Sequence, residues 1–339
     1  MLAAPAPLDA RTGGYIYNRR IADGLRDAGW RVDMLALDPS FPQPTATAMD
    51  HAALTLAAVP AGVVAIVDSL ALGALGDVIR REASRRRIAA LIHQPRGGAA
   101  EARALHAASL VVLTGSAALP AVQQQGVPLH RVVVVEPGTD RPALPPRPAR
   151  RGGPVELLSV ATINAGKGHE ALLRALATVR PDSWRLTCAG SLTRDAATAD
   201  RVRGLAGALG LQDRVAFTGD LDPAALGVLY AGADVFVLAT RQETYGMAVA
   251  EALAYGLPIV ATTTGAIPAL VGDDAGVLVP VDDVDALAAA LARVVEDERL
   301  RERLAEGARR RRDQLPTWQD ASRRFADALA SLVAVDTRG

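Results

Sequence analysis

The sequence predicts an α/β protein with two doubly wound, parallel-sheet domains. Short apolar runs typical of buried strands alternate with longer amphipathic segments along the whole chain, which is the order of strand–helix–strand crossover units. The length of 339 residues exceeds what one small core organises. A proline- and arginine-rich stretch at residues 142–154 interrupts the alternation, and we place the domain boundary there.

The first half begins with a short apolar run at residues 1–4, and a helix opens at Gly13 and Gly14. A glycine pair between a first strand and a first helix lets the backbone approach a ligand closely. The spacing differs from the dinucleotide-binding fingerprint, and the acidic residue expected at a later strand end is missing. A nicotinamide cofactor is therefore disfavoured. A strand at 63–67 and a helix at 70–86 are expected next.

His93 follows the next predicted strand, at residues 88–92. Open α/β sheets bind ligands at the carboxyl ends of their strands, so His93 is a candidate site residue. A histidine that serves only the structure of the strand end is an equally open interpretation. Strands at 110–113 and 132–135 complete this half.

The second half restarts the alternation with a strand at residues 157–161. Lys167 follows in a glycine-flanked loop just before a helix, where it can reach an anion at the helix terminus, although an exposed loop lysine is often only solvated. Two further strands end at Gly190 and shortly before Leu221. We expect the ends of these strands to face one crevice.

Two glutamates stand between apolar runs at residues 233–239 and 258–261. Glu243 lies in a loop and Glu251 inside the following helix, with seven residues between them. The helix begins near Gly246, so its free N–H groups and dipole would attract a phosphate. Two carboxylates would repel that phosphate unless each accepts a hydrogen bond from its own hydroxyl. The hexose and the ribose of a sugar nucleotide offer such hydroxyls on either side of the diphosphate. Two solvated glutamates on a surface helix are the alternative.

This stretch, with residues 262–268 after it, resembles the donor-site signature of the family-4 retaining glycosyltransferases of the GT-B fold. The resemblance implies that Glu243 contacts the donor sugar and Glu251 the nucleotide ribose. It assigns the distal phosphate and sugar to the amides of Tyr245, Gly246 and Met247.

The resemblance extends to other parts of the site. It implies that Gly13 and Gly14 face the donor diphosphate, that His93 lies near the sugar, and that Lys167 holds the diphosphate. Backbone groups near Gly190 and Leu221 would meet the base.

Thr162 departs from the family pattern, which has an arginine there. The loss of one charge-assisted contact weakens donor binding by about 1.5–3 kcal/mol, unless a residue such as Arg19 or Arg241 compensates.

The resemblance also implies the domain layout, with the two Rossmann-like domains facing across a cleft. Residues 1–141 would form the acceptor-side domain, 142–154 a linker and 155–315 the nucleotide-sugar-binding domain, and a helix in 316–339 would return to the first domain. The hinge at residues 136–140 lacks the asparagine usual in the family, and the loop at 96–100 is short for a family in which it frames the acceptor.

The implied activity is retaining transfer of a sugar from a nucleoside-diphosphate sugar to a small-molecule, lipid or glycan acceptor. No metal or other cofactor is expected, because no Asp-x-Asp motif stands at a strand end. The alternatives are a sugar-nucleotide epimerase, a glycoside phosphorylase and a catalytically weak partner or binding subunit. A pyridoxal-lysine setting is missing for the phosphorylase, whereas Thr162 and the short loop favour the weak subunit.

Composition limits the partners and the compartment. Half of the residues are hydrophobic and the formal net charge is zero, so nothing attracts nucleic acid, and peripheral membrane contact is a minor alternative. Cys188 is the only cysteine, which excludes an internal disulfide and fits a reducing compartment. The chain has no apolar stretch of membrane-spanning length and no signal-peptide pattern, so we expect a cytoplasmic protein.

Overall fold

A computed structural model describes residues 1–143 and 152–334. The chain divides into two compact units: the first holds residues 1–138 and the C-terminal segment from Pro316, and the second runs from Thr139 to Leu315. Residues 144–151 of the expected linker lie outside the described residues.

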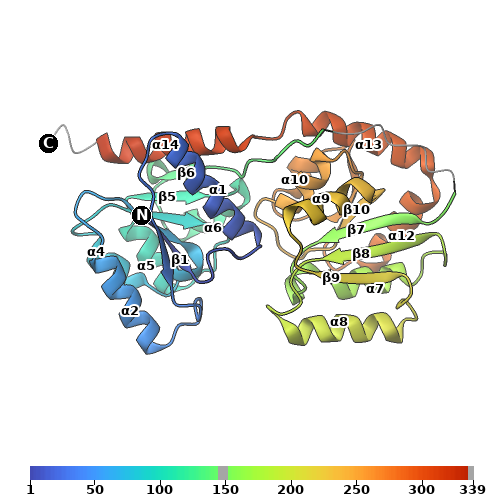
Figure 1. The fold of residues 1–339 in the computed structure, drawn as a ribbon, viewed down its shortest axis with the longest axis horizontal. Coiled ribbons are helices and arrows are strands. Elements are labelled where there is room, and N and C mark those ends of the chain that lie inside the picture. Colours follow the sequence, from blue (N-terminus) through green and yellow to red (C-terminus); the bar gives the residue numbers. More distant parts are fainter. Residues whose placement is uncertain (144–151, 335–339) are drawn as a thin grey trace. The chain divides into compact units, whose positions relative to one another are not determined.

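The first unit is built on a six-stranded parallel sheet with strand order β2-β1-β3-β4-β5-β6. Its strands are β1 (Leu2–Pro5), β2 (Met34–Leu37), β3 (Ala65–Asp68), β4 (Ile88–Ile92), β5 (Leu110–Leu113) and β6 (Val132–Val134). Its helices are α1 (Gly13–Asp27), α2 (Ala46–Ala57), α3 (Ser69–Leu72), α4 (Gly76–Glu82), α5 (Ala99–Ala107), η1 (Ser116–Ala118), α6 (Leu119–Gln124), η2 (Leu129–Arg131) and α14 (Trp318–Ala334) (Figure 1).

The second unit repeats this architecture, with strand order β12-β11-β10-β7-β8-β9 and parallel pairing throughout. Its strands are β7 (Val155–Val160), β8 (Trp184–Ala189), β9 (Val215–Gly219), β10 (Val235–Leu238), β11 (Ile259–Thr262) and β12 (Gly276–Val279). Its helices are η3 (Ala165–Lys167), α7 (His169–Leu176), α8 (Ala196–Ala208), α9 (Pro223–Gly232), α10 (Met247–Ala254), α11 (Ile267–Val271), α12 (Val284–Glu296) and α13 (Glu298–Arg312). The two parallel sheets with helices around them confirm the predicted fold class.

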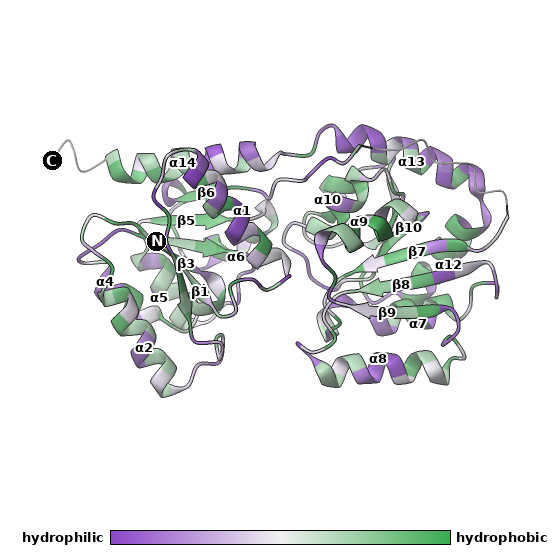
Figure 2. Cartoon of the chain, in the orientation of Figure 1, coloured by the Kyte–Doolittle hydropathy of each residue, from purple (hydrophilic) through white to green (hydrophobic). Residues whose placement is uncertain are grey.

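Each sheet buries apolar side chains on both faces, because helices cover both. In β1, Ala3 packs into one buried cluster, whereas Leu2 and Ala4 pack into another. In β7, Leu157 and Leu158 divide in the same way between two clusters. Figure 2 shows β5 in hydrophobic colours and most of α13 in hydrophilic ones. Near-continuous apolar strands are therefore the expected signature of these sheets.

The strand order fixes where ligands can bind in each unit. Chain order reverses between β1 and β3 in the first sheet and between β7 and β10 in the second. We call each of these positions the switch point of its sheet. The loops that leave such a strand pair diverge to opposite faces of the sheet and open a crevice at the carboxyl ends. In the second unit those loops carry Lys167 and Glu243, and in the first Asp68 is the last residue of β3.

The C-terminal helix α14 belongs to the first unit, which confirms its predicted return. Phe325 is completely buried among residues of α1 and the first sheet. The ring of Trp318 meets that of Tyr17 edge to face at 6.1 Å between centroids, and the Arg20 guanidinium lies 5.0 Å above it. Figure 1 shows α14, in red, beside α1, in blue. Aromatic and apolar burial therefore docks the chain's last helix.

The prediction of a single helix over residues 70–86 was wrong. The structure has two shorter helices, α3 and α4, separated at Gly73–Leu75. Gly76 begins α4 so close to the backbone of the next helix that an added Cβ would lie 2.3 Å from the carbonyl oxygen of Ala100. This close approach and the low helix propensity of glycine explain the break.

Across residues 1–143 and 152–334, no helix combines the length and the apolar character that crossing a lipid bilayer requires.

Gly24 and Gly204 provide a matched test of α14 docking. A Cβ at Gly24, in α1, would lie 2.0 Å from Ser322 Oγ in α14, whereas a Cβ at Gly204, in α8, meets nothing within 4 Å. We expect Gly24→Ala to lower the free energy of unfolding by about 1–3 kcal/mol through overpacking. Gly204→Ala should raise it by about 0.5–1 kcal/mol. Urea unfolding followed by tryptophan fluorescence measures both, and equal responses would contradict the close packing of α1 on α14.

Candidate functional site

The loops after β7 and β10 are in direct contact. Gly168 has a φ of +68°, and a Cβ there would lie 1.9 Å from the carbonyl oxygen of Ala239. The backbone N–H of Arg241 donates to the carbonyl of Gly166 at 2.8 Å. Only glycine allows both the left-handed turn and this approach, so residue 168 fixes how the two loops sit together.

Lys167 and Glu243 form an ion pair across these loops. The Lys167 Nζ lies 2.7 Å from Glu243 Oε2, and the two side chains are 26% and 18% exposed. A charge-assisted hydrogen bond that is largely shielded from water is stronger than a solvated surface pair. The structure thus joins two of the predicted site residues in one contact that partial exposure leaves open to a ligand.

The backbone around Glu243 is held from a third loop. A Cβ at Gly265, in the loop after β11, would lie 1.6 Å from the carbonyl oxygen of Glu243, so only glycine fits there. Gly246 precedes α10, which starts at Met247. The first amides of a helix have no partner within it and carry the positive end of the dipole. The predicted amide donors therefore stand beside the ion pair, whereas the Tyr245 side chain is buried in the core.

Glu251, in α10, is held by a residue that the motifs did not identify. The hydroxyl of Tyr230, in α9, donates to Glu251 Oε2 at 2.8 Å, and the Tyr230 ring stacks on that of Tyr255 at 5.1 Å. Burial raises the pKa of Glu251 to about 7; the Tyr230 hydrogen bond opposes the shift and the charge of Asp140 adds to it. Glu251 therefore changes its charge near neutral pH.

The remaining predicted residues of the second unit lie at strand ends. Thr162 and Gly190 follow β7 and β8, and Leu221 follows β9. The backbone N–H of Gly190 donates to the carbonyl of Gly219 at 3.0 Å, which joins the last two of these strand ends.

Both candidates for replacing the family arginine already have partners. The guanidinium of Arg19 donates to the carbonyls of Leu8 and Ala10, in the first unit. Arg241 is bound to Asp282 at 2.6 Å and to the carbonyl of Ala165, in the loop that carries Thr162 and Lys167. Of the two, Arg241 is the one that lies at the loop where the arginine is missing.

His169 is a buried neighbour of Lys167 that sequence patterns passed over. His169 is the first residue of α7 and is 2% exposed, and among the described residues neither of its ring nitrogens has a hydrogen-bond partner. Burial and, to a lesser degree, the Lys167 charge lower its pKa to about 4. His169 is therefore neutral at physiological pH, and Lys167 supplies the positive charge at this loop.

In the first unit, Gly14 and His93 are brought together. A Cβ at Gly14 would lie 3.1 Å from His93 Cδ2, so the ring rests on the first turn of α1, which Gly13 begins. The His93 Nε2 lies 3.2 Å from Asp68 Oδ2 and 3.0 Å from Asn18 Oδ1. Neither Asp68 nor Asn18 belongs to a motif, and only the fold brings them to His93.

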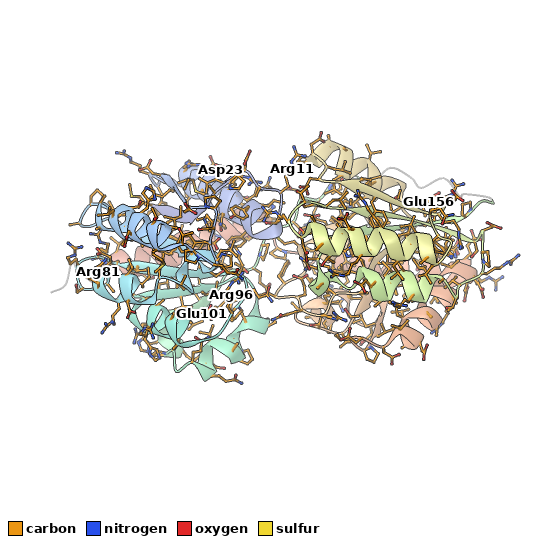
Figure 3. The ribbon with its side chains drawn as sticks, turned by 90° about the horizontal axis from the view of Figure 1, so that it is seen from below. Arg11, Asp23, Arg81, Arg96, Glu101 and Glu156 are labelled. Carbon is orange, nitrogen blue, oxygen red and sulfur yellow. The ribbon has the colours of Figure 1, made fainter. Side chains whose placement is uncertain are left out.

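The loop after His93 is fastened by a buried carboxylate. Glu101, in the first turn of α5, accepts from the backbone N–H groups of Arg96 and Gly97, the latter at 2.6 Å, and from Gln125 Nε2. Figure 3 labels Arg96 and Glu101, which lie close together. The short loop expected to frame an acceptor is thus held by hydrogen bonds to α5.

Lys167 is also distinguished by the composition of the chain, because it is the only lysine of the sequence. Lysine offers a compact, rotatable charge, whereas the planar arginine fork suits bidentate partners. This count marks Lys167 in the sequence itself.

In the described part of the chain, no group of three or more His, Cys, Asp or Glu side chains is placed to hold a metal ion.

Known proteins resemble this chain in sequence and in fold. A D-inositol 3-phosphate glycosyltransferase of Xylanimonas cellulosilytica is 32% identical over 66% of this chain and 56% of its own length. An MMP alpha-(1->4)-mannosyltransferase of Mycolicibacterium hassiacum is 30% identical over 63% of this chain and 51% of its own. This chain therefore spans about half the length of the curated relatives it matches.

Two solved structures share the fold over almost their whole length. Sucrose-phosphate synthase of Thermosynechococcus elongatus has a TM-score of 0.82 at 23% identity, covering 98% of this chain and 99% of that one. Anabaena HepE in complex with UDP-glucose has a TM-score of 0.79 at 19% identity, covering 97% and 99%.

The family model for glycosyl transferases group 1 matches residues 140–311, which include Lys167, Glu243 and Glu251. The match covers half of the chain and almost all of the second unit. The chain therefore belongs to the group 1 glycosyl transferases and has the GT-B fold, as the resemblance predicted.

Proposed function

We propose that this protein transfers a sugar from a nucleoside-diphosphate sugar to a hydroxyl of an acceptor, with retention of configuration and without a metal ion. The observation that carries the proposal is the Lys167–Glu243 ion pair at the switch point of the second sheet. The pair lies within the segment that matches the family and beside the N-terminus of α10.

Donor binding would exchange the partners of this ion pair. The diphosphate carries more negative charge than one carboxylate, so it takes the Lys167 ammonium and the α10 amides as its donors. Glu243 is then free to accept from hydroxyls of the donor sugar. The ion pair keeps both groups ordered until the ligand arrives, which reduces the cost of organising the site.

In the transfer step, the bond between the sugar C1 and the β-phosphate oxygen breaks, and a bond from C1 to the acceptor oxygen forms on the same face. The acceptor proton goes to the departing phosphate, which serves as the base. Lys167 and the amides beside Gly246 stabilise the negative charge that develops on that phosphate. The work of the protein is therefore positioning and electrostatic stabilisation.

The names of the relatives suggest which class of acceptor to propose. Several are named D-inositol 3-phosphate glycosyltransferases and one is named a mannosyltransferase. We propose a small hydroxylated acceptor as the first class to assay, with lipid and glycan acceptors next.

The sole lysine makes a direct test of donor binding possible. Pyridoxal 5′-phosphate followed by borohydride labels amines, here Lys167 and the N-terminal amine. We expect UDP, GDP or ADP to reduce labelling of the Lys167 peptide, because the diphosphate occupies the ammonium, whereas the matching nucleoside should not. Peptide mass spectrometry measures both sites, and the N-terminal amine is the internal control. Equal Lys167 labelling with and without each of the three nucleotides would contradict the proposal.

Charge removal tests the catalytic part of the proposal. We expect Lys167→Ala and Glu243→Ala each to lower the rate of transfer by about 10²-fold or more, because each removes a group that stabilises or positions the reacting sugar phosphate. Arg203→Ala and Glu302→Ala, at exposed helix positions, are the controls. Initial rates with a donor and acceptor panel measure the effect, and circular dichroism checks the fold. Near-normal rates in both site variants would remove the mechanism.

Glu251 predicts a pH dependence of nucleotide binding. Ribose hydroxyls that donate to the carboxylate favour its ionised form, so affinity should rise as the pH passes upward through about 7. Below that pH, binding should weaken by up to about tenfold for each pH unit and should release a proton. Calorimetry at pH 6 and pH 8 measures the change. Glu251→Gln should abolish the dependence, and an unchanged dependence in this variant would show that another group titrates.

A catalytically weak binding subunit remains the second candidate, because Thr162 stands where the family has an arginine and Arg241 is paired with Asp282. Nucleotide-sugar binding without turnover across a broad acceptor panel would favour it. Conversion of the donor sugar in the absence of an acceptor would instead indicate an epimerase.

A further inference from the structure

Asp68 is a buried carboxylate that the proposed function does not use. It is the last residue of β3, one of the two strands at the switch point of the first sheet, and it is 1% exposed. A buried charge is costly unless hydrogen bonds satisfy it. Its partners therefore show what the carboxylate does.

Each oxygen of Asp68 has a defined donor. Oδ1 accepts from the backbone N–H of Leu70 at 2.8 Å and caps α3. Oδ2 accepts from Asn18 Nδ2 at 2.6 Å. Burial raises the pKa of Asp68. The charge of His93 and the hydrogen bonds from His93, Leu70 and Asn18 together outweigh this effect, so the pKa lies below its usual value. Asp68 is ionised at neutral pH.

The ionised carboxylate fixes the orientation of the Asn18 amide. Because Asp68 only accepts, the Asn18 NH₂ group must face it, and the amide oxygen must face the other way. That oxygen lies 3.0 Å from His93 Nε2, and Asp68 Oδ2 lies 3.2 Å from the same nitrogen. Two acceptors therefore face Nε2, which must carry the hydrogen.

The ring of His93 is also held in place. The Tyr17 ring meets it edge to face at 5.4 Å between centroids and 81° between planes. Gly14 leaves room for the ring, since a Cβ there would lie 3.1–3.4 Å from Cδ2, Cγ and Nε2. The side chain is 17% exposed, and across the described residues no hydrogen bond to Nδ1 is found. In neutral His93, Nδ1 is therefore an accessible acceptor.

We propose that Asp68, acting partly through Asn18, is the positioning residue that locks His93 in its Nε2–H tautomer, so that Nδ1 accepts a hydrogen bond from a substrate hydroxyl. The inference rests on the proposed function for the identity of the substrate. It adds a constraint on specificity, because the group that meets Nδ1 must donate. A hydroxyl of the sugar or of the acceptor satisfies it, whereas an unprotonated phosphate oxygen does not.

Asp68→Asn is a substitution that should reverse the tautomer while preserving the cap. The new amide oxygen can still accept from Leu70. Its NH₂ group would face Asn18, whose amide must then turn its oxygen toward residue 68 and its NH₂ group toward His93. Nε2 would meet donors only and become the acceptor, so the hydrogen moves to Nδ1.

Nitrogen-15 NMR of histidine-labelled protein at pH 8 measures the tautomer directly, with His93 assigned by its absence from the His93→Gln spectrum. We expect the Nε2–H form in the wild-type protein and in the Asp50→Asn control, and the Nδ1–H form in Asp68→Asn. We also expect Asp68→Asn to lower kcat for donor turnover about tenfold or more, with nucleoside-diphosphate affinity unchanged. A residue with a purely structural role would not reverse the tautomer.

The wild-type spectrum alone can overturn the proposal, even if Asp68→Asn fails to fold, because an Nδ1–H form contradicts the lock. A reversed tautomer with an unchanged kcat would overturn the role of Nδ1 and leave the proposed function intact. Failure of the wild-type protein to bind any nucleotide or turn over any donor would instead overturn the proposed function and, with it, the hydroxyl contact at Nδ1. The lock itself would still be decided by the spectra.

Discussion

The ion pair between Lys167 and Glu243 is the interaction on which the candidate site of the second unit depends. The strand order brings their two loops together at the switch point, and Gly168 and Gly265 let the backbones approach closely enough to hold them. Each charge satisfies the other in the free protein. In the proposed function a diphosphate replaces the carboxylate, and the partial exposure of the pair supports this exchange.

Each unit also contains a buried carboxylate held by an uncharged side chain. Glu251 accepts from Tyr230 in the second unit, and Asp68 accepts from Asn18 in the first. The outcomes differ, because burial prevails at Glu251 and raises its pKa, whereas His93 and two further donors, Leu70 and Asn18, keep the pKa of Asp68 low. Glu251 is therefore suited to titrate near neutral pH, and Asp68 is suited to stay charged.

The departure at Thr162 has a structural counterpart in Arg241. This arginine contacts the same loop, but its guanidinium is bound to Asp282. Arginine and lysine act differently on a diphosphate, since only the guanidinium gives a bidentate clamp. In the proposed site, Lys167 is therefore the cation that binds the diphosphate. Arg241 lies at the same loop and is paired with Asp282, whose side chain is exposed.

The sequence by itself determined the alternation of strands and helices, the fold class, the positions of Lys167, Glu243 and His93 in loops that follow strands, and that of Glu251 in a helix, because these follow from local periodicity and motif spacing. Only the tertiary structure decided which side chains meet them. Tyr230 and Asn18 reach their carboxylates from helices distant in sequence, and no local pattern encodes such contacts. The start of a separate helix at Gly76 involves likewise a close approach to Ala100, a contact made by folding alone.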